Sequence, residues 1–479
     1  MMIRGNFLTR FNGGGFSPLL NQTSPFNKRR TFQSEMIRKK EDQQVTDIFI
    51  FKSQQEPVEA LEKIEKKLTK SDFIADTPQS HVMKGTSEFV PHERVFEAIE
   101  NVESYSHIKG EEALMVFDLN RVADKLETWK KAFPQVSPHY AVKANPQPEL
   151  IEYMAKDLNM SFDCASPSEI ELVLSYGVDP DRIIYANPTK SIPHIEYARA
   201  HGVKKMTFDS PSELFKVQSV YPDADLVLRI WTDDSDAQCS LSNKYGATTE
   251  ESVELLTLAK QLNLNIIGVS FHAGSGGSQD TYVSALRDAH MIFQKGKTEG
   301  FDMKLLDIGG GFPASETAEC SVKNIGELLQ PIISHPDWSG VEIISEPGRF
   351  FCAEAVTLAV KVMGKRKRGG LINYYVNDGL YKSFNCIMYD HSGEVSYNTQ
   401  VKSQDEVPLL PSIIFGQSCD GLDTISSGLL LPELKLNDGL MFPVMGAYTN
   451  TASSNFNGFQ HTDKLIIDPV QQENPQASS

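Results

Sequence analysis

The sequence predicts an α/β protein that consists of a (β/α)8, TIM-like barrel and a C-terminal antiparallel β-sheet or β-barrel domain. Three observations support this fold class. Between about residues 119 and 358, short β-rich runs alternate with segments of helical spacing, which indicates parallel strand pairing. The alternation gives eight strand-like runs in roughly 215 residues, which fits the size of such a barrel. After residue 358 the segments are β-rich and separated by turns, without long amphipathic helices.

The first 80 residues differ from the rest and are expected to form an N-terminal extension. The first 40 hold eight Lys or Arg and a single acid, Glu35. This composition favours a disordered arm, and a targeting segment stays open as the alternative. Residues 56–70 have apolar side chains at helical spacing, which predicts a short amphipathic helix within the extension.

The barrel segment is predicted element by element. Asp118 or Asn120 is expected to cap a first helix. Two later connections nearly repeat, and each carries Ser-x-x-Glu before an apolar helix, which predicts capping boxes at 166–169 and 210–213. A doubly wound sheet is the structural rival, but the Gly-x-Gly-x-x-Gly turn is missing after the first strand. The expected strand regions are 139–146, 161–166, 183–188, 206–210, 226–230, 266–276, 305–311 and 342–348, with helices over 250–262 and 281–293.

The remaining segments are assigned to the second domain. A strand near 113–119, just ahead of the barrel, is expected to join its sheet. The sheet domain therefore comprises residues 81–118 and 359–470, around a barrel of 119–358, and the tail 471–479 is expected to be disordered. The expected strands of this domain lie within 371–381, 412–422, 439–449 and 464–469.

Composition narrows the class of function. The formal net charge is −17, which repels phosphate backbones, so nucleic acid is a poor candidate partner and a cationic small molecule a better one. No apolar run approaches the roughly 18–20 residues that span a bilayer, so no membrane association is expected. The six cysteines are scattered without C-x-x-C or zinc-like spacing, which predicts reduced thiols, a cytoplasmic setting and no metal site.

Chemically active residues follow the predicted barrel strands. In such a barrel the active site forms where the strands end at their C-terminal face. Each of these residues alone has an ordinary reading as a surface, capping or core group, and only their convergence on one rim indicates a site. In chain order they are Lys143, Asp163, Asn187, Asp209, Arg229, His272, the Gly309–Gly311 run, Glu346 and Arg349.

The glycine-rich stretches 274–277 and 309–311 follow the sixth and seventh predicted strands. Small residues let backbone N–H groups approach an anion, and the late loops are the usual phosphate site of this barrel. A phosphate there, with Lys143 on the same rim, suggests pyridoxal phosphate, which needs an amine and an acidic partner at its ring nitrogen. Glu346 can be that acid, His272 could stack on the ring, and Arg229 could sit near Glu346.

The residues also carry a family resemblance over about 85–465. They resemble eukaryotic ornithine decarboxylases, a fold-type III family that uses pyridoxal phosphate. One such motif would be weak, but ten in order are specific. They are HYAVKANP, SFDCAS, RIIYANP, VLRIWTDDS, GVSFHAGSG, LLDIGGGFP, SEPGR, VNDGLYKSFNCIMYDH, SCDGLD and MGAYT.

The resemblance implies roles at the matching positions. Lys143 would carry the cofactor covalently, and catalysis would also need His272, Glu346 and Cys419 as proton donor. Tyr389, Asp390 and Asp420 would bind the substrate, with the two aspartates at its distal ammonium. The cofactor would be held by Lys143, Asp163, Arg229, His272, Ser275, Gly309, Gly310, Gly311, Glu346, Arg349 and Tyr448.

The resemblance further implies an ornithine decarboxylase that makes putrescine, the first step to polyamines. It implies a head-to-tail homodimer in which Cys419 and Asp420 serve the neighbouring subunit. Lysine, arginine or diaminopimelate decarboxylation stays open, as does a non-catalytic role like that of antizyme inhibitors. An antizyme contact would fall at about residues 190–216. Racemase chemistry is disfavoured, because racemases place an arginine where Glu346 stands.

Five positions depart from the family pattern, and none of them removes a catalytic group. Phe415 and Lys382 are expected to alter the rim of the pocket, so the choice of substrate is the inference that they weaken. The departing residues are Ser240, Ala273, Lys382, Phe415 and Gln417.

Overall fold

The computed structural model describes residues 49–51, 91–102, 112–315, 320–390 and 408–469. The helix predicted over 56–70, most of the predicted extension and the tail 471–479 lie outside these residues. Within the extension, β1 (Phe49–Phe51) pairs antiparallel with β15 (Gly439–Phe442). These three residues therefore belong to the sheet rather than to a disordered arm.

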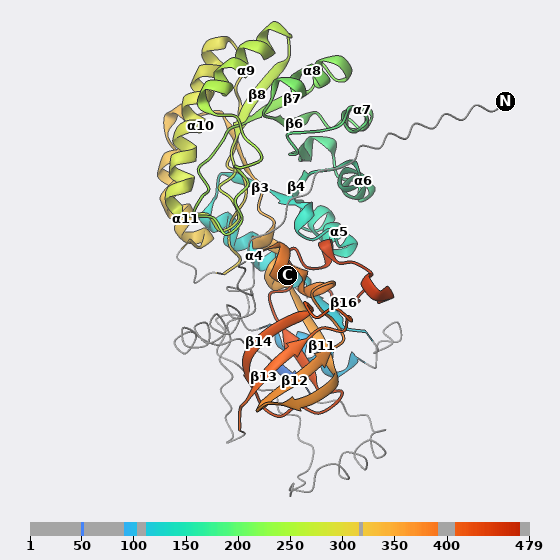
Figure 1. The fold of residues 1–479 in the computed structure, drawn as a ribbon. Helices are drawn as coiled ribbons and strands as arrows, with labels where there is room; N and C mark the ends of the chain where they lie inside the picture. The colour runs from blue at the N-terminus through green and yellow to red at the C-terminus, as the bar shows by residue number, and fades with distance from the viewer. Residues whose placement is uncertain (1–48, 52–90, 103–111, 316–319, 391–407, 470–479) are drawn as a thin grey trace, which may run out of the picture. The chain divides into compact units, whose positions relative to one another are not determined.

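Eight described strands close into a parallel barrel, as the sequence predicts (Figure 1). The barrel closes between the last strand and the first, where Ile343 pairs with Val136. The strands are β3 (Val136–Ala141), β4 (Ser161–Cys164), β5 (Ile183–Tyr185), β6 (Lys205–Phe208), β7 (Asp225–Arg229), β8 (Asn265–Ser270), β9 (Leu305–Asp307) and β10 (Glu342–Ser345).

Helices connect the barrel strands, and several of them begin at a residue whose side chain caps the first turn. Asp118 accepts a 3.1 Å hydrogen bond from the N–H of Asn120, so the predicted cap is Asp118. Thr248 and Glu251 form a complete capping box. The helices are α4 (Leu119–Ala132), α5 (Pro148–Lys156), α6 (Pro167–Ser175), α7 (Ile192–Ala200), α8 (Pro211–Val220), α9 (Thr249–Gln261), α10 (Gln279–Glu299), α11 (Val322–Ile333) and the short α12 (Arg349–Cys352).

A mixed sheet of eight described strands forms the second domain (Figure 1). Besides β1 and β15 it contains β2 (Leu114–Asp118), β11 (Val356–Arg368), β12 (Leu371–Val376), β13 (Leu410–Phe415), β14 (Thr424–Leu431) and β16 (Asp463–Ile467). The predicted sheet is not purely antiparallel, because β12 pairs parallel with β13 and β2 with β16. The connection 377–409 and the barrel itself are long enough for the crossovers that parallel pairs need.

The strand predicted just ahead of the barrel joins this sheet, as expected. β2 pairs antiparallel with β11 and parallel with β16. The short α3 (Glu93–Glu100) packs its buried residues in one cluster with β2 and β16, and α13 (Cys386–Tyr389) follows β12. Among the described residues, no helix is long and apolar enough to cross a membrane.

Two apolar clusters support the barrel. Ile184, Val227, Ile267, Leu305 and Ile344 come from five of its strands and fill its interior. A larger cluster lies between the strands and the helices around them. In that outer cluster Trp129 of α4 is fully buried, and its Nε1–H donates to the Val136 carbonyl at 2.9 Å. The strands are thereby held so that their C-terminal ends form one rim.

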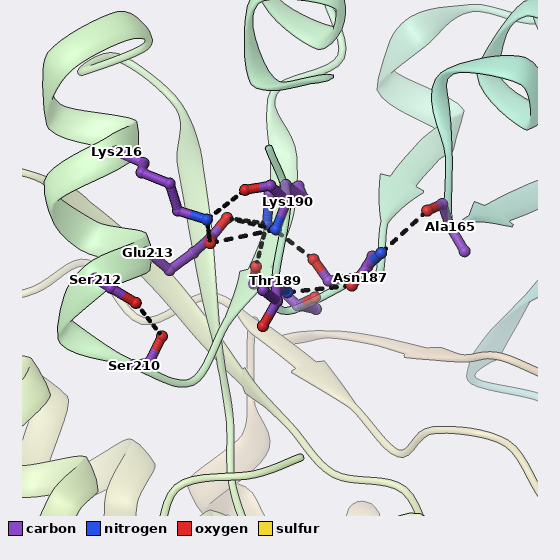
Figure 2. Close-up of polar contacts among 9 residues, drawn as sticks. Ala165, Asn187, Thr189, Lys190, Ser210, Ser212, Glu213 and Lys216 are labelled. Atoms are coloured by element: carbon purple, nitrogen blue, oxygen red, sulfur yellow. Dashed lines mark hydrogen bonds and ion pairs between the residues drawn. The ribbon is translucent and has the colours of Figure 1, made fainter. Parts of the chain in front are cut away.

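Glu213 of α8 does not form the capping box that the sequence predicts at 210–213. Ser210 contacts the Ser212 hydroxyl, and Glu213 turns inward to Lys190 and Lys216, at 2.9 and 2.5 Å (Figure 2). Both Lys190 and Glu213 have fully buried side chains. The Ser-x-x-Glu spacing is therefore a false signal here, because a buried lysine outside the motif captures the carboxylate.

The capping box predicted at 166–169 forms with a shift of one residue. Ser166 accepts from the N–H of Glu169 at 3.3 Å, as in a capping box. The Glu169 carboxylate accepts from the N–H of Ala165 instead of Ser166, at 2.6 Å. The backbone N–H groups of Ala165 and Glu169, at the start of α6, thus both have hydrogen-bond partners within the motif.

Candidate active site

Lys143 stands at the barrel mouth beside Asp163. It lies in the 3₁₀ turn Val142–Ala144, directly after β3, and its Nζ donates to Asp163 Oδ2 of β4 at 2.7 Å. Asp163 is buried, whereas the Lys143 side chain is 41% exposed, so the amine can be reached from the mouth. Burial lowers the pKa of Lys143, but the charge and hydrogen bond of Asp163, together with Tyr448 and Glu346, outweigh burial and raise that pKa above its ordinary value.

Glu346 follows β10 and is buried in the same mouth. Its backbone N–H donates to the Gly309 carbonyl at 2.8 Å, which fixes the start of its side chain. Burial raises the pKa of Glu346 well above its ordinary value, and the neighbouring carboxyls of Asp307 and Asp163 raise it further. The Glu346 carboxyl thus binds a proton more readily than an exposed glutamate, which suits a group that shares a proton with a ring nitrogen.

His272 is a neutral ring with a defined tautomer. Burial lowers its pKa well below the ordinary value, and the positive charge of Arg229 lowers it further. Nδ1 accepts from the N–H of Gly274 at 3.0 Å, so the proton of the neutral ring lies on Nε2. A Cβ at Gly310 would lie 2.9 Å from that Nε2, so only glycine leaves this imidazole its place.

A second group of predicted residues gathers around the Arg349 guanidinium. Arg349 donates to Ser275 Oγ at 3.2 Å and lies over the Tyr448 ring, 5.1 Å from its centroid. Tyr448 is tied to the lysine turn, because its N–H donates to the Ala144 carbonyl at 2.9 Å. Four distant parts of the chain thus meet in a cationic, hydroxyl-lined corner.

The two glycine-rich loops close the same corner. The N–H of Gly276 donates to the Gly311 carbonyl at 3.1 Å, so the loops after β8 and β9 are joined. Gly311 has a φ of +99°, and a Cβ there would collide with the Gly274 carbonyl. The glycines predicted from the sequence are therefore required for close approach of the two backbones.

Asp390 lies against this corner. Its Oδ1 accepts from Arg349 at 2.6 Å. Its Oδ2 is buried and has no hydrogen-bond partner among the described residues. Asp390 thus presents one free acceptor oxygen beside the guanidinium.

Three other residues of the predicted rim hold loops or neighbours. Arg229 was expected near Glu346, and its guanidinium lies over the Tyr245 ring, 5.3 Å from the ring centroid. The carboxyl hydrogen-bonded to Glu346 is that of Asp307. Asn187 accepts from the N–H of Thr189 at 3.1 Å. Asp209 accepts from the N–H of Gly246 at 3.0 Å, which closes the loop after β7.

Cys419, Asp420 and Tyr389 lie elsewhere in the chain. The N–H of Cys419 donates to Asn457 Oδ1 at 2.9 Å, and Asp420 accepts from the Tyr381 hydroxyl. Tyr389 is 73% exposed. No described contact joins Cys419 or Asp420 to the barrel residues of the same chain. Cys419 is exposed, so another molecule can reach it.

The departures from the family pattern lie mostly away from the mouth. Lys382 is buried, and its Nζ lies 3.3 Å from Glu112. Phe415 stacks on Tyr375, with 5.5 Å between ring centroids. Ser240 donates to Asp234 at 2.6 Å. Lys382 thus does not reach the rim, contrary to the expectation from the sequence.

The residues present fit pyridoxal phosphate. An amine and a carboxyl of raised pKa stand on one rim, and an arginine, a hydroxyl and glycine loops form the anion corner. Asp163 Oδ1 is buried without a described partner, which leaves an acceptor inside the mouth. A phosphate would be held by Arg349 and Ser275, and the ring by His272 and Glu346.

Asp307 was missed in the sequence. It lies two residues before Gly309, to whose N–H it is bonded at 2.9 Å, and it is fully buried. Its place at a strand end, ahead of a glycine run, was the available signal. The sequence analysis assigned the glycine run after Asp307 to phosphate binding and gave the Asp307 carboxylate no role.

The comparisons with known proteins agree with this site. Residues 119–353 match the family model of the pyridoxal-dependent decarboxylases, pyridoxal binding domain. Ornithine decarboxylase of Rattus norvegicus is 45% identical over 385 residues, which are 77% of this chain and 83% of the rat protein. The chain belongs to the pyridoxal-dependent decarboxylases. Its cofactor is pyridoxal phosphate.

The names of other similar proteins state different functions. Antizyme inhibitor 2 of Xenopus laevis is 44% identical over 378 residues, 76% of this chain and 82% of that protein. The arginine decarboxylase of Paramecium bursaria Chlorella virus has a TM-score of 0.72 at 37% identity, over 78% of this chain and 100% of that one. A lysine/ornithine decarboxylase from Vibrio vulnificus, complexed with cadaverine, has a TM-score of 0.70 at 32% identity, over 79% of this chain and 100% of that one.

Proposed function

We propose that this protein decarboxylates L-ornithine to putrescine and carbon dioxide. One observation carries the proposal: a reachable amine, Lys143, and a buried acid with a raised pKa, Glu346, occupy the same barrel mouth. An α-amino acid decarboxylase needs the amine to hold the cofactor and the acid to keep the ring nitrogen positive. Similarity to curated ornithine decarboxylases supports the choice of reaction.

The cofactor, when bound, supplies a covalent attachment for the amino acid and an electron sink for the electrons left by its carboxylate. Lys143 would attach it, and Asp163 would orient the Lys143 amine through their 2.7 Å contact. Arg349, Ser275, Tyr448 and the Gly309–Gly311 loop would hold the phosphate.

Three residues would handle protons in the reaction. His272 is neutral and would cover the ring face without adding positive charge to it. Glu346 would hold or release a proton at its carboxyl oxygen toward the ring nitrogen. Cys419 of a second copy would deliver the proton that replaces the lost carboxyl group, since a positioned thiol can act as a general acid.

The substrate's distal ammonium would be bound by two carboxylates. Asp390 offers the buried, free Oδ2 described above, and Asp420 of a second copy would complete the pair. Charge-assisted hydrogen bonds of this kind are about twice as strong as neutral ones. The active form would therefore be a homodimer with shared sites. We further propose a location in the cytoplasm.

Carbon dioxide release from ornithine, lysine and arginine, with and without added cofactor, tests the assignment. One methylene changes binding by about 1–3 kcal/mol, so kcat/KM should favour ornithine over lysine by roughly 5- to 150-fold. Equal or reversed values would refute ornithine as the substrate. Glu346→Ala should lower kcat far more than it weakens cofactor binding, because it removes the acid and leaves the phosphate corner intact.

A non-catalytic role that sequesters a regulatory protein is the second candidate. Antizyme inhibitor 2 is nearly as similar to this chain as the ornithine decarboxylases are. Ile192 and Phe215, within the region expected to contact an antizyme, are both exposed apolar side chains. A visible cofactor band in the purified protein, with a borohydride-trapped adduct on Lys143, supports the enzyme. Absence of both supports sequestration.

A further inference from the structure

Asp307 and Glu346 form a carboxyl pair inside the barrel. β9 and β10 are in register at Asp307 and Ile344. Leu305 and Ile344 belong to the interior cluster, and alternate strand residues face the same side. Asp307 and Glu346, each two residues further on, therefore point into the barrel mouth. The two carboxyls are joined by a hydrogen bond.

Each oxygen of Asp307 has a separate task. Oδ1 accepts from the N–H of Gly309 at 2.9 Å, which fixes the carboxyl plane. Oδ2 is buried and receives no bond from any N–H or hydroxyl group of the described residues. The Glu346 carboxyl is thus the group left to satisfy Asp307. A hydrogen bond between two carboxyls requires a proton on one of them, because both are acceptors once ionised.

The surrounding charges place that proton on Glu346. Burial raises the pKa of Asp307 to about 7, the bond from Glu346 opposes that rise, and Asp163 adds to it while Arg229 reduces it. The pKa of Glu346 is raised further, since Asp307 and Asp163 both face it and Lys143 only partly compensates. The hydrogen bond between the two carboxyls requires one shared proton, and the raised pKa of Glu346 favours that proton on Glu346, with Asp307 as the acceptor.

We propose that Asp307 is a positioning residue that fixes the orientation of the Glu346 carboxyl and retains a proton on it for the ring nitrogen of the cofactor. The proposal rests on the proposed function, because it concerns the acid of that same site. Asp307 touches neither cofactor nor substrate in this scheme. Its negative charge and its hydrogen bond act through Glu346.

A double-mutant cycle tests whether Asp307 acts through Glu346. Asp307→Asn keeps the shape and the bond to Gly309 but cannot accept the Glu346 proton at the amide. Loss of a charge-assisted bond should lower kcat by about 10- to 100-fold, with the phosphate corner unchanged. In the Glu346→Ala background the same change should alter kcat by less than about twofold. Equal losses in both backgrounds would overturn the proposal.

A spectroscopic readout separates positioning from simple support of the fold. Solid-state ¹⁵N NMR of holoenzyme with ring-labelled cofactor reports whether the ring nitrogen carries a proton. We expect it protonated across neutral and mildly alkaline pH in the wild type, and titrating within that range in Asp307→Asn. Thr207→Val is the matched control. The Thr207 hydroxyl, like Asp307 Oδ2, is a buried oxygen without a described partner, and its removal leaves the Asp307–Glu346 pair intact. An unchanged ¹⁵N shift in Asp307→Asn contradicts the proposal.

Infrared spectroscopy of the unmutated apoprotein covers the case in which Asp307→Asn does not fold. A protonated carboxyl band is expected in the apoprotein at neutral pH, because the hydrogen bond between the two carboxyls requires a proton on one of them. A missing band overturns the proposal. A wild type that shows this band but releases no carbon dioxide from ornithine defeats the proposed function and leaves the carboxyl pair standing.

Discussion

The ion pair between Lys190 and Glu213 offers a quantitative test of the fold around the site. Both side chains are fully buried, 2.9 Å apart, and Lys190 also donates to the carbonyls of Asn187 and Thr207 (Figure 2). At an effective dielectric of about 20, this separation gives a Coulomb attraction of roughly 6 kcal/mol. Burial lowers the pKa of Lys190 nonetheless, because desolvation outweighs the carboxylate. The net value of the pair is therefore much smaller than its attraction.

Glu213→Gln removes the charge and keeps the volume. It leaves the Lys190 ammonium buried without a counter-ion, which costs about 3–5 kcal/mol in comparable cases. Since 1.4 kcal/mol corresponds to a factor of ten, amide exchange in residues 186–191 and α8 should accelerate by about 100-fold or more. Hydrogen exchange with mass spectrometry of these peptides measures it.

The exposed pair Lys156–Glu152 supplies the control. Its partners are 2.7 Å apart with side chains about half exposed, so Glu152→Gln should change exchange by less than about threefold. Replacing both buried partners, as in Lys190→Met with Glu213→Leu, should restore most of the protection. Exchange in Glu213→Gln within threefold of wild type would refute the argument from buried charge.

Three further predictions concern the site and its pH response. Asp390→Asn should raise KM for ornithine by about 10- to 100-fold and also weaken cofactor binding, because Asp390 accepts a hydrogen bond from Arg349. Steady-state kinetics with cofactor titration measures both effects, and an unchanged KM contradicts the prediction. Mixing inactive Lys143→Ala and Cys419→Ala proteins should recover about a quarter of wild-type activity if sites are shared, and none if each chain is self-sufficient. Burial lowers the pKa of His139 to about 3 from an ordinary 6.5, so the unfolded state binds the extra proton and the free energy of unfolding decreases as the pH is lowered from about 6.5 to about 3. His139→Gln removes this effect and should move the midpoint of acid unfolding, measured by fluorescence, to lower pH. An unmoved midpoint rules this out.

The sequence predicts the barrel well because its signals are local and repeated. Each strand overlaps a short β-rich run of the sequence, although β3 begins at Val136, ahead of the run predicted at 139–146. The site residues follow from the same logic, since parallel strands in a barrel end on one rim. That rule places Lys143, Asp163 and Glu346 together without knowledge of any contact.

Features that depend on distant partners escape this reasoning. The Ser-x-x-Glu motif at 210–213 is a local rule, and nothing within it reveals that Lys190 will capture Glu213. Likewise, a β-rich run does not state the direction of its partner, so the parallel pairing of β12 with β13 was not foreseen. Asp307 was overlooked because its role appears only when β10 brings Glu346 beside it.

The course of β2 has a consequence for synthesis on the ribosome. Phe117 pairs with Val356, and Leu114 to Asp118 are buried along their whole length, yet both neighbours of this strand are encoded after the barrel. β2 must therefore remain without its sheet partners while the whole barrel, about half of the polypeptide, is translated. The nascent chain should fold its barrel first, with this strand shielded by chaperones until its late partners arrive.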